Sequence, residues 1–424
     1  MQFTNLSDYI KVKYVLERDG EICSEGWIPE KEIPEIPPGQ KGKVPLALEI
    51  PSSGKCYLKL YYSLKKNREP VPLPADYMLG FDEIYLGGVK EVVKGVRPPY
   101  ENLTMGSDPI HTPHPTNAIH IEETDTCLIC KNGGFRWVYN KKTGLFDEMG
   151  FEKGSDPLHL LREPMEISLW RAPTDNDRDL KEEWLRAGYD RAYTRAYDTE
   201  WRRTDDGAEI RSRLGVLADG LQRIMNIRAI WRIEDHGSLQ MKMEVERNMD
   251  FPELPRFGLR LLLPEGMDFL EYYGMGPMES YVDKHQASSH GIYHQAVAEC
   301  HEDYIRPQEN GSHYDCDYVW IRSRGKDGIT ESGKWEEMGM IVYGENPFSF
   351  QASVFTEEEL TKKAHNYELV PSGNKVLHLD YRQNGIGSAS CGPRLLPRYR
   401  FEEERFTFSL KWSLIRPRVF EDFL

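Results

Sequence analysis

The chain lacks any apolar run that approaches the ~18 residues needed to span a bilayer. It also lacks an excess of basic residues, because 54 Lys and Arg stand against 69 Asp and Glu, which gives a formal charge of −15. Such a charge repels phosphate backbones. With 39% hydrophobic and 29% charged residues, the composition is that of a soluble globular protein, and we expect neither a membrane nor a nucleic-acid partner.

Cysteine is scarce, with seven residues scattered over 424 positions. An odd number of dispersed thiols argues against a disulfide framework and is typical of a reducing compartment. The N-terminal segment has neither the charged nor the apolar region of a signal peptide, so we expect a cytoplasmic location. Cys127-x-x-Cys130 is half of a zinc site, but no second pair follows it, which favours two thiols on one strand.

Alternation of apolar and polar residues dominates the first hundred positions. Residues 10–16, 44–50 and 56–64 each place their apolar side chains on one side of an extended chain. This is the pattern of half-buried β-strands. Short strands at this spacing, with turn residues at 51–54, favour an antiparallel sandwich of immunoglobulin size.

The same alternation returns after residue 117 and is clearest at 239–245 and 406–414. Helices are predicted only at 179–188 and after the capping-box sequence TEEE at 356–359. A (β/α)₈ barrel needs eight alternations of strand and helix over about 250 residues. The sequence therefore predicts an all-β protein without such a barrel.

The segment from Arg97 to Pro115 contains five prolines and no periodicity, so we expect it to run extended and exposed. This predicts a first domain at 1–96, truncated at its N-terminus, a linker at 97–116 and a second domain at 117–424. His111, His114 and His120 invite a metal site, but near a proline-rich linker solvated histidines are the favoured interpretation.

A dense set of polar residues follows a predicted strand in the sequence LWRAPTDND at 169–177. Arg171, Asp175, Asn176 and Asp177 would gather hydrogen-bond donors and acceptors that suit sugar hydroxyls. The same residues would equally fix a loop through Asx-turn hydrogen bonds. Taken alone, this structural role is the favoured interpretation.

Two glutamates lie in aromatic and glycine-rich segments. Glu279 stands in YYGMGPMESY, and Glu309, followed by Asn310, stands in YIRPQENG. Paired carboxylates could serve a glycosidase. Buried ion pairs with Arg306 or another cation would produce the same sequence, and we favour this structural interpretation.

The glycine-rich segment NGIGSASCGP at 384–393 lets the backbone turn sharply beside a ligand or another domain. It lacks the third glycine and the following helix of a dinucleotide site. Cys391 has no evident histidine partner that would make it a nucleophile. We therefore predict no catalytic residue in this loop.

Taken in order, these segments resemble the C-terminal region of the large family 2 β-galactosidases. That family carries RAPxDND, GxGPxExYxD, YxxPxENG and GIG segments, which stand here at 171–177, 274–283, 304–311 and 385–387, before a final strand with Trp412. Four matches in the same order exceed what chance would give. The first hundred residues resemble, more weakly, the immunoglobulin-like domain that precedes this region.

The resemblance implies an all-β fold, in which an immunoglobulin-like β-sandwich is followed by a large supersandwich similar to galactose mutarotases. It implies retaining hydrolysis of β-galactosides through two glutamates on a central barrel, which have no counterpart in this sequence. The chain alone is then expected to be inactive and to hold no metal or other cofactor, Mg²⁺ and Na⁺ belonging to the complete enzyme. Its expected partner is a large subunit or further copies of itself.

The resemblance further implies that the loop after GIG lines one side of the substrate pocket. The residues concerned are Gly385, Gly387, Ser388, Ser390 and Cys391. Where members of that family present a tryptophan to the sugar, this chain has Ser390-Cys391-Gly392. We therefore expect this domain to shape the pocket mainly through its backbone, with an altered preference for the aglycone.

Two other functions remain as alternatives. A carbohydrate-binding module would use Trp170, Trp320 or Trp335 as a stacking platform, although single tryptophans on alternating strands are more often part of a core. An aldose mutarotase would need a His and Glu pair in one pocket. Three histidines are available for it: His285, His290 and His294.

Overall fold

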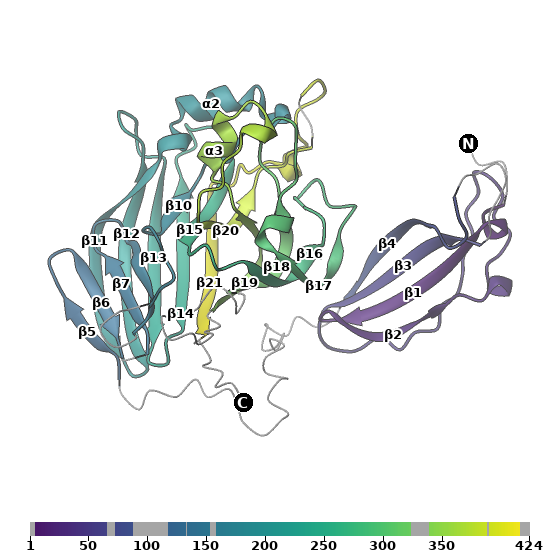
Figure 1. The fold of residues 1–424 in the computed structure, drawn as a ribbon, viewed down its shortest axis with the longest axis horizontal. Coiled ribbons are helices and arrows are strands. Elements are labelled where there is room, and N and C mark those ends of the chain that lie inside the picture. Colours follow the sequence, from purple (N-terminus) through teal and green to yellow (C-terminus); the bar gives the residue numbers. More distant parts are fainter. Residues whose placement is uncertain are drawn as a thin grey trace. The chain divides into compact units, whose positions relative to one another are not determined.

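The computed structural model describes residues 5–65, 73–87, 118–132, 134–152, 158–323, 339–387 and 390–415. The chain divides into two compact units, Met1–Pro109 and Ile110–Leu424. The predicted linker at 97–116, with His111 and His114, lies outside the described residues. Strands dominate both units (Figure 1), which confirms the expected all-β class.

The first unit contains one antiparallel sheet in the order β2-β1-β3-β4. Its strands are β1 (Ile10–Arg18), β2 (Glu21–Trp27), β3 (Cys56–Leu64) and β4 (Met78–Gly87). Apolar side chains on one face of β1 and β3 form a small core together with Ile28 and Ile33 from the connecting segment. The predicted strands at 10–16 and 56–64 are thus confirmed.

The predicted strand at 44–50 is wrong. Residues 41–50 pair with no other strand, yet Val44 and Leu46 pack against the small core. The alternation therefore records contact of one side of the segment with the core. Without a partner strand, this contact does not produce a ladder of backbone hydrogen bonds.

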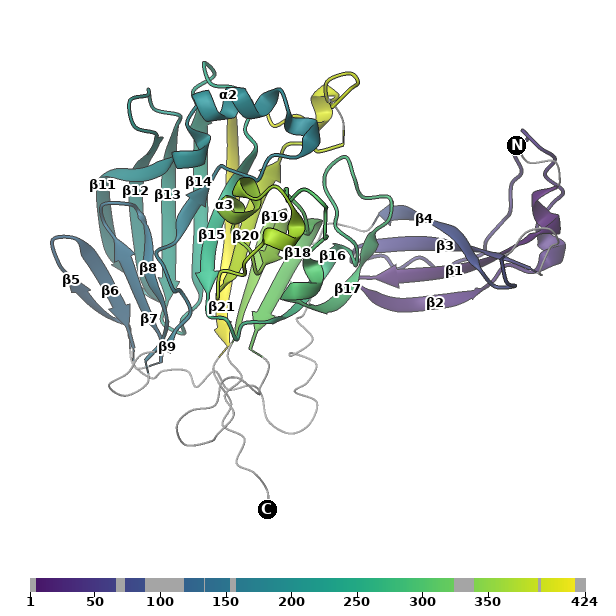
Figure 2. The same cartoon turned by 45° about the horizontal axis from the view of Figure 1, so that its top comes forward.

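The second unit is built on two sheets. The larger has twelve strands, nine of them in the order β10-β15-β20-β19-β21-β14-β13-β12-β11, with β16, β17 and β18 attached through β19. Figure 2 shows β21, in yellow, inside this sheet. The nine strands are β10 (Glu166–Ser168), β11 (Tyr193–Thr204), β12 (Gly207–Leu217), β13 (Met225–Glu234), β14 (Leu239–Arg247), β15 (Arg256–Leu263), β19 (Gly339–Ser353), β20 (Lys375–Gln383) and β21 (Arg405–Ile415).

The remaining strands and the helices complete the unit. The attached strands are β16 (Phe269–Gly276), β17 (Ser289–Ala296) and β18 (Ser312–Arg322). The second sheet runs β5 (His120–Glu123), β6 (Cys127–Lys131), β7 (Arg136–Asn140), β8 (Leu145–Phe151) and β9 (Leu158–His159). Helix α2 (Leu180–Arg186) lies within the predicted helix, and α3 (Glu357–Lys362) follows Thr356, whose hydroxyl accepts a hydrogen bond from Glu359 N at 3.2 Å.

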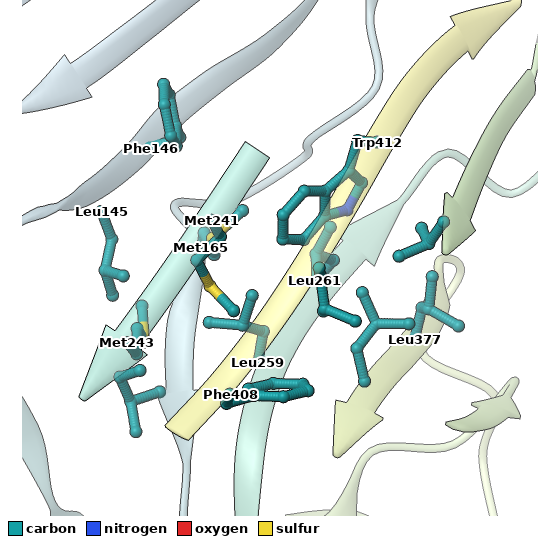
Figure 3. Close-up of a cluster of buried hydrophobic side chains, with 14 of the residues drawn as sticks. Leu145, Phe146, Met165, Met241, Met243, Leu259, Leu261, Leu377, Phe408 and Trp412 are labelled. Atoms are coloured by element: carbon teal, nitrogen blue, oxygen red, sulfur yellow. The ribbon is translucent and has the colours of Figure 1, made fainter. Parts of the chain in front are cut away.

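The core of the second unit lies between its two sheets. Phe146 of β8 meets Trp231 of β13 edge to face at a centroid distance of 5.0 Å, and Trp231 packs on Trp412 of β21 at 5.9 Å. Figure 3 shows Phe146 and Trp412 with Phe408 and the methionines of β14 in this cluster. Edge and tilted contacts of this kind are the preferred geometries of aromatic rings. The predicted strands at 239–245 and 406–414 are confirmed as β14 and β21, and their apolar side chains are part of this core.

No helix in the described ranges is long and apolar enough to cross a membrane. The same ranges contain two α-helices. A (β/α)₈ barrel would need eight, so the described residues do not form one.

Candidate functional site

Arg171 connects the polar sequence after β10 to the glycine-rich loop after β20. Its side chain is fully buried, and Nε and Nη2 donate to the Asp177 carboxylate at 3.2 and 2.7 Å. Nη1 donates to Asn384 O at 2.5 Å and Nη2 to Gly385 O at 3.1 Å. One guanidinium thus joins two segments that lie far apart in the sequence.

The sequence that carries Arg171 is itself fixed by local hydrogen bonds. Asp177 Oδ2 accepts from Thr174 N at 2.9 Å and from Thr174 Oγ1 at 3.1 Å. The next contact reaches the glycine loop, because Asn176 Nδ2 donates to Ile386 O. Asp175 points elsewhere: its exposed carboxylate lies 3.5 Å from Arg306 Nη1.

Asp283 holds the same loop through its backbone amides. Its Oδ1 accepts from Ile386 N at 3.0 Å and its Oδ2 from Gly387 N at 2.8 Å. A Cβ atom at Gly385 would lie 2.6 Å from Asp283 Oδ2, closer than such atoms can approach, which explains the glycine. We call Arg171, Asn176, Asp177 and Asp283 the loop clamp, since together they hold the backbone of residues 384–387.

Glu309 is buried, and its predicted ion pair exists with a different cation. Its Oε2 lies 3.5 Å from Nη1 of the buried Arg256. Arg256 also binds the Asp380 carboxylate through two hydrogen bonds of 3.2 and 2.7 Å. Burial raises the pKa of Glu309, and the charges of Arg256 and Arg171 oppose that rise. The sequence allowed Arg306 or another cation as the partner; Arg306 pairs with Asp175, and Arg256 is that other cation.

Glu279 is also buried and engaged. Its Oε1 accepts from Lys284 Nζ and Tyr304 OH, and its Oε2 accepts from Gly311 N at 2.9 Å. Asn310 fixes the adjoining turn, because it accepts from Glu302 N at 3.0 Å and donates to Gln308 O at 2.8 Å. The acidic and amide groups of this region therefore act in the described structure as anchors of loops.

A cleft of about 460 Å³ is lined by chain neighbours of the loop clamp. Val282 and Gln383, the residues immediately before Asp283 and before the clamped loop, both line it. Its walls combine aromatic, amide, hydroxyl and charged side chains, among them Tyr314, Asp315, Asn346, Phe348, Ser349, Tyr381, Arg382, Arg398 and Glu403. The cleft has the size of a small-ligand site, and the clamped segment reaches it only through its chain neighbours Val282 and Gln383.

The outer part of the loop is more open. Cys391 is exposed and Ser390 half-buried, and a Cβ atom at Gly392 would meet no atom within 4 Å. Ser388 lies outside the described residues. Of the predicted loop residues, Gly385 and Gly387 therefore lie in the segment that the clamp holds, while Ser390 and Cys391 lie beyond that segment.

The residues behind the alternative functions have structural partners. Trp170 is buried, packs edge-on against Trp184 and donates from Nε1 to Thr361 Oγ1 at 3.3 Å. Trp320 is half-buried with the Arg322 guanidinium 4.7 Å from its ring, and Trp335 lies outside the described residues. The buried Trp170 offers no face for stacking on a sugar.

The three histidines considered for a mutarotase each meet a different group. His285 Nδ1 lies 2.8 Å from Tyr281 O, His290 Nε2 lies 2.9 Å from Asp315 Oδ2, and His294 Nδ1 lies 3.4 Å from Glu271 Oε2.

In the part of the chain that the structure describes, the candidate metal ligands do not gather into a donor set. Cys127 and Cys130 lie on β6, and burial raises the pKa of Cys130 to about 12. Among the described residues, no three His, Cys, Asp or Glu side chains are grouped so that they could hold a metal ion.

Sequence reasoning missed Arg256 and Asp380, which form the most deeply buried ion pair next to the clamp. A usable signal existed. Both are charged residues in strands, RFGLRLLL and KVLHLDYRQ, that also carry several apolar side chains. Charges in such strands are rarely buried unless they are paired.

Residues 131–412 match the family described as beta galactosidase small chain, and residues 1–87 match beta-galactosidase domain 4. The first match spans well over half of the chain. The chain belongs to the β-galactosidase small-chain family. The four ordered segments that suggested this family stand at 171–177, 274–283, 304–311 and 385–387. The resemblance of the chain to the C-terminal region of a β-galactosidase is confirmed.

Individual relatives agree with this assignment. A β-galactosidase of Actinobacillus pleuropneumoniae is 33% identical to this chain. The alignment covers 98% of this chain and 37% of the A. pleuropneumoniae protein. A β-galactosidase of Staphylococcus xylosus is 35% identical over 58% of this chain and 24% of its own. The chain therefore spans only 24% to 37% of the length of these curated relatives.

Solved structures give a weaker likeness. A galactose 1-epimerase of Lactobacillus acidophilus overlaps 71% of this chain and 99% of its own, at 8% identity and a TM-score of 0.34. A likeness at this level has no bearing on the function of the small-chain family member.

Proposed function

We propose that this chain is the C-terminal part of a retaining β-galactosidase, and that its second unit forms one wall of the substrate site. The observation that carries the proposal is the loop clamp, which fixes residues 384–387 from two sides, while the chain neighbours Val282 and Gln383 line a cleft. The substrate would be a terminal β-D-galactoside such as lactose. The clamped loop and the residues that follow it would contact that substrate.

The clamp suits such a role because it fixes backbone groups before any ligand arrives. Arg171 holds two carbonyl oxygens of the loop, and Asp283 holds two of its amides. Groups held in this way lose little conformational freedom when a substrate binds, which lowers the entropic cost of binding. With Cys391 exposed in place of an aromatic ring, the wall would act through shape and backbone polarity.

The bond-breaking glutamates would be supplied by a barrel that the described residues do not form. Glu279 and Glu309 do not suit that chemistry, since Glu279 is bound by Lys284 and Tyr304 and Glu309 lies against Arg256. We therefore propose that the chain is inactive alone. It would act in the cytoplasm, with a large subunit or with further copies of itself.

The proposal is tested by complementation. This chain is mixed with a separately produced polypeptide that carries the catalytic barrel of a related β-galactosidase, and hydrolysis of nitrophenyl β-galactoside is measured. We expect activity in the mixture well above the sum of the parts. In the mixture, Asp283→Ala should raise KM, whereas Asp175→Ala, which removes an exposed carboxylate outside the clamp, should leave KM unchanged.

Two outcomes would overturn the proposal. Equal activity of this chain alone and of the mixture would place the chemistry within it. A mixture in which Asp283→Ala and Asp175→Ala behave alike would remove the loop clamp from the substrate site.

A further inference from the structure

Strand β12 places Glu209, Arg211 and Arg213 on one face of the large sheet, because alternate residues of a strand point to the same side. The strand register sets Glu209 opposite Arg202 of β11 and opposite Arg232 of β13. Three arginines on neighbouring strands thereby surround a single carboxylate. We call Arg202, Arg211 and Arg232 the arginine triad.

The triad is bound to Glu209 through one edge of each guanidinium. Arg202 Nε and Arg211 Nε donate to Glu209 Oε1 at 3.0 and 2.8 Å, and Arg232 Nε donates to Oε2 at 2.8 Å. The Glu209 side chain is only 1% exposed, although it lies on the outer face of the sheet, whereas the arginines are 65%, 56% and 55% exposed. The carboxylate is therefore covered by the guanidiniums that it orients.

The charges of this cluster do not cancel. Burial tends to raise the pKa of Glu209, but the hydrogen bonds from the triad outweigh it and lower the pKa to about 2. The carboxylate therefore stays ionised at neutral pH. The register also sets the exposed Glu200 opposite Arg211 on the same face. Three positive charges against these two carboxylates leave a surplus of one.

Other arginines on the same face are matched one to one. Arg213 pairs with Asp198, and Arg405 pairs with Glu246. Within the described residues, the Nη1 groups of the triad make no hydrogen bond. In a chain whose net charge is −15, this is a local surplus of positive charge with free donors.

We propose that the arginine triad binds a tetrahedral oxyanion, either free inorganic phosphate or the phosphate group of a small monoester. A guanidinium presents paired N–H donors that match phosphate oxygens, and charge-assisted hydrogen bonds of this kind are strong. A phosphate group carries a negative charge of more than one at neutral pH and presents several oxygens, so it can accept from more than one guanidinium of the triad.

The site is also organised before a ligand binds. Arg211 and Arg232 stand on strands inside the sheet, and Glu209 already fixes the inner edge of all three guanidiniums. Exposed arginines usually lose rotamer entropy when they grip an anion. Here Glu209 has already imposed part of that order. The proposal is independent of the galactosidase function.

The test is a calorimetric titration of the full chain with inorganic phosphate. The ionic strength is held fixed with chloride as the balancing salt. Glycerol 3-phosphate is titrated in parallel, so that tighter binding of either compound identifies a free ion or a monoester as the ligand. The test variants are Arg232→Gln and Arg202→Gln. Arg202 lies on the outermost strand β11, so its replacement should leave the fold intact, which circular dichroism verifies.

The matched control is Arg213→Gln, on the same strand and face as Arg211 but paired with Asp198. We expect saturable binding of one anion, weakened roughly tenfold by each triad variant, the loss of one charge-assisted contact, and unchanged by the control. Binding that is absent, that does not saturate, or that weakens equally in Arg213→Gln would overturn the proposal.

Discussion

The loop clamp and the arginine triad with Glu209 both combine arginine with a carboxylate, but they do so for opposite purposes. In the clamp, the fully buried Arg171 has one carboxylate and two backbone carbonyls as partners. In the triad, three half-exposed arginines share one carboxylate. A buried charge needs its own counter-charge and partners for its donors, whereas water stabilises a surplus at the surface. The clamp therefore positions backbone, and the triad remains free to attract a ligand.

The largest effect is expected from removing the buried charge of the clamp. Arg171→Met should lower the free energy of unfolding by about 3–5 kcal/mol, because it leaves the Asp177 carboxylate buried without its cation. Urea denaturation measures this loss. Arg178→Met is the control, since Arg178 is 76% exposed and lies 3.9 Å from Asp179, and it should cost less than about 0.5 kcal/mol. Similar losses in both variants would abolish the distinction between buried and exposed charge.

The close approach of Asp283 to the loop predicts a smaller effect. Gly385→Ala would force a Cβ atom against Asp283 Oδ2, so we expect a loss of about 1–3 kcal/mol in unfolding free energy and a raised KM in the complemented enzyme. Gly392→Ala, where space is open, should change neither quantity. A harmless Gly385→Ala would show that the clamp is loose.

Glu209, the carboxylate that the triad surrounds, gives the next prediction. Glu209→Gln should destabilise the chain by roughly 1–2 kcal/mol at pH 7, because three guanidiniums then lose their charged acceptor. The folded-state pKa of Glu209 is lowered from 4.5 to about 2. Its contribution is therefore complete above the unfolded pKa and is lost as pH falls toward 2. Urea midpoints measured from pH 6 to 2 should converge for the two proteins. A gap that persists at pH 2 would contradict this assignment.

The smallest effect concerns the outer part of the loop, beyond the clamp. Cys391→Trp would supply an aromatic face for the C–H groups of a sugar, which should lower KM several-fold in the complemented enzyme, consistent with a stacking contribution of ~1 kcal/mol. Cys23→Trp, at an exposed cysteine of the first unit, is the control. An unchanged KM across several galactosides would separate Cys391 from the substrate.

The strands of the second unit could be predicted because side-chain alternation is a local property. Residues 239–245 and 406–414 alternate in sequence and form β14 and β21. The segment at 44–50 alternates equally well and forms no strand. Alternation indicates which side of a segment is buried. It does not indicate whether a partner strand is available.

The candidate site was predicted in pieces and not as a whole. Its three segments stand out by composition, but the contact of Arg171 with Gly385 spans more than two hundred residues, and local patterns say nothing of such a contact. The triad depends in the same way on the register of three strands, which sets Arg202, Glu209 and Arg232 in one row. Ion-pair partners such as Arg256 for Glu309 are decided by this tertiary arrangement.

The position of β21 in the large sheet constrains the order in which the molecule can be made. It is the last of the described strands in the chain, yet it pairs with β14 on one side and β19 on the other. During synthesis, both neighbours must wait with an unpaired edge until residues 405–415 leave the ribosome, and open edges invite aggregation. The two halves of the sheet can therefore join only after the ribosome has added its final strand.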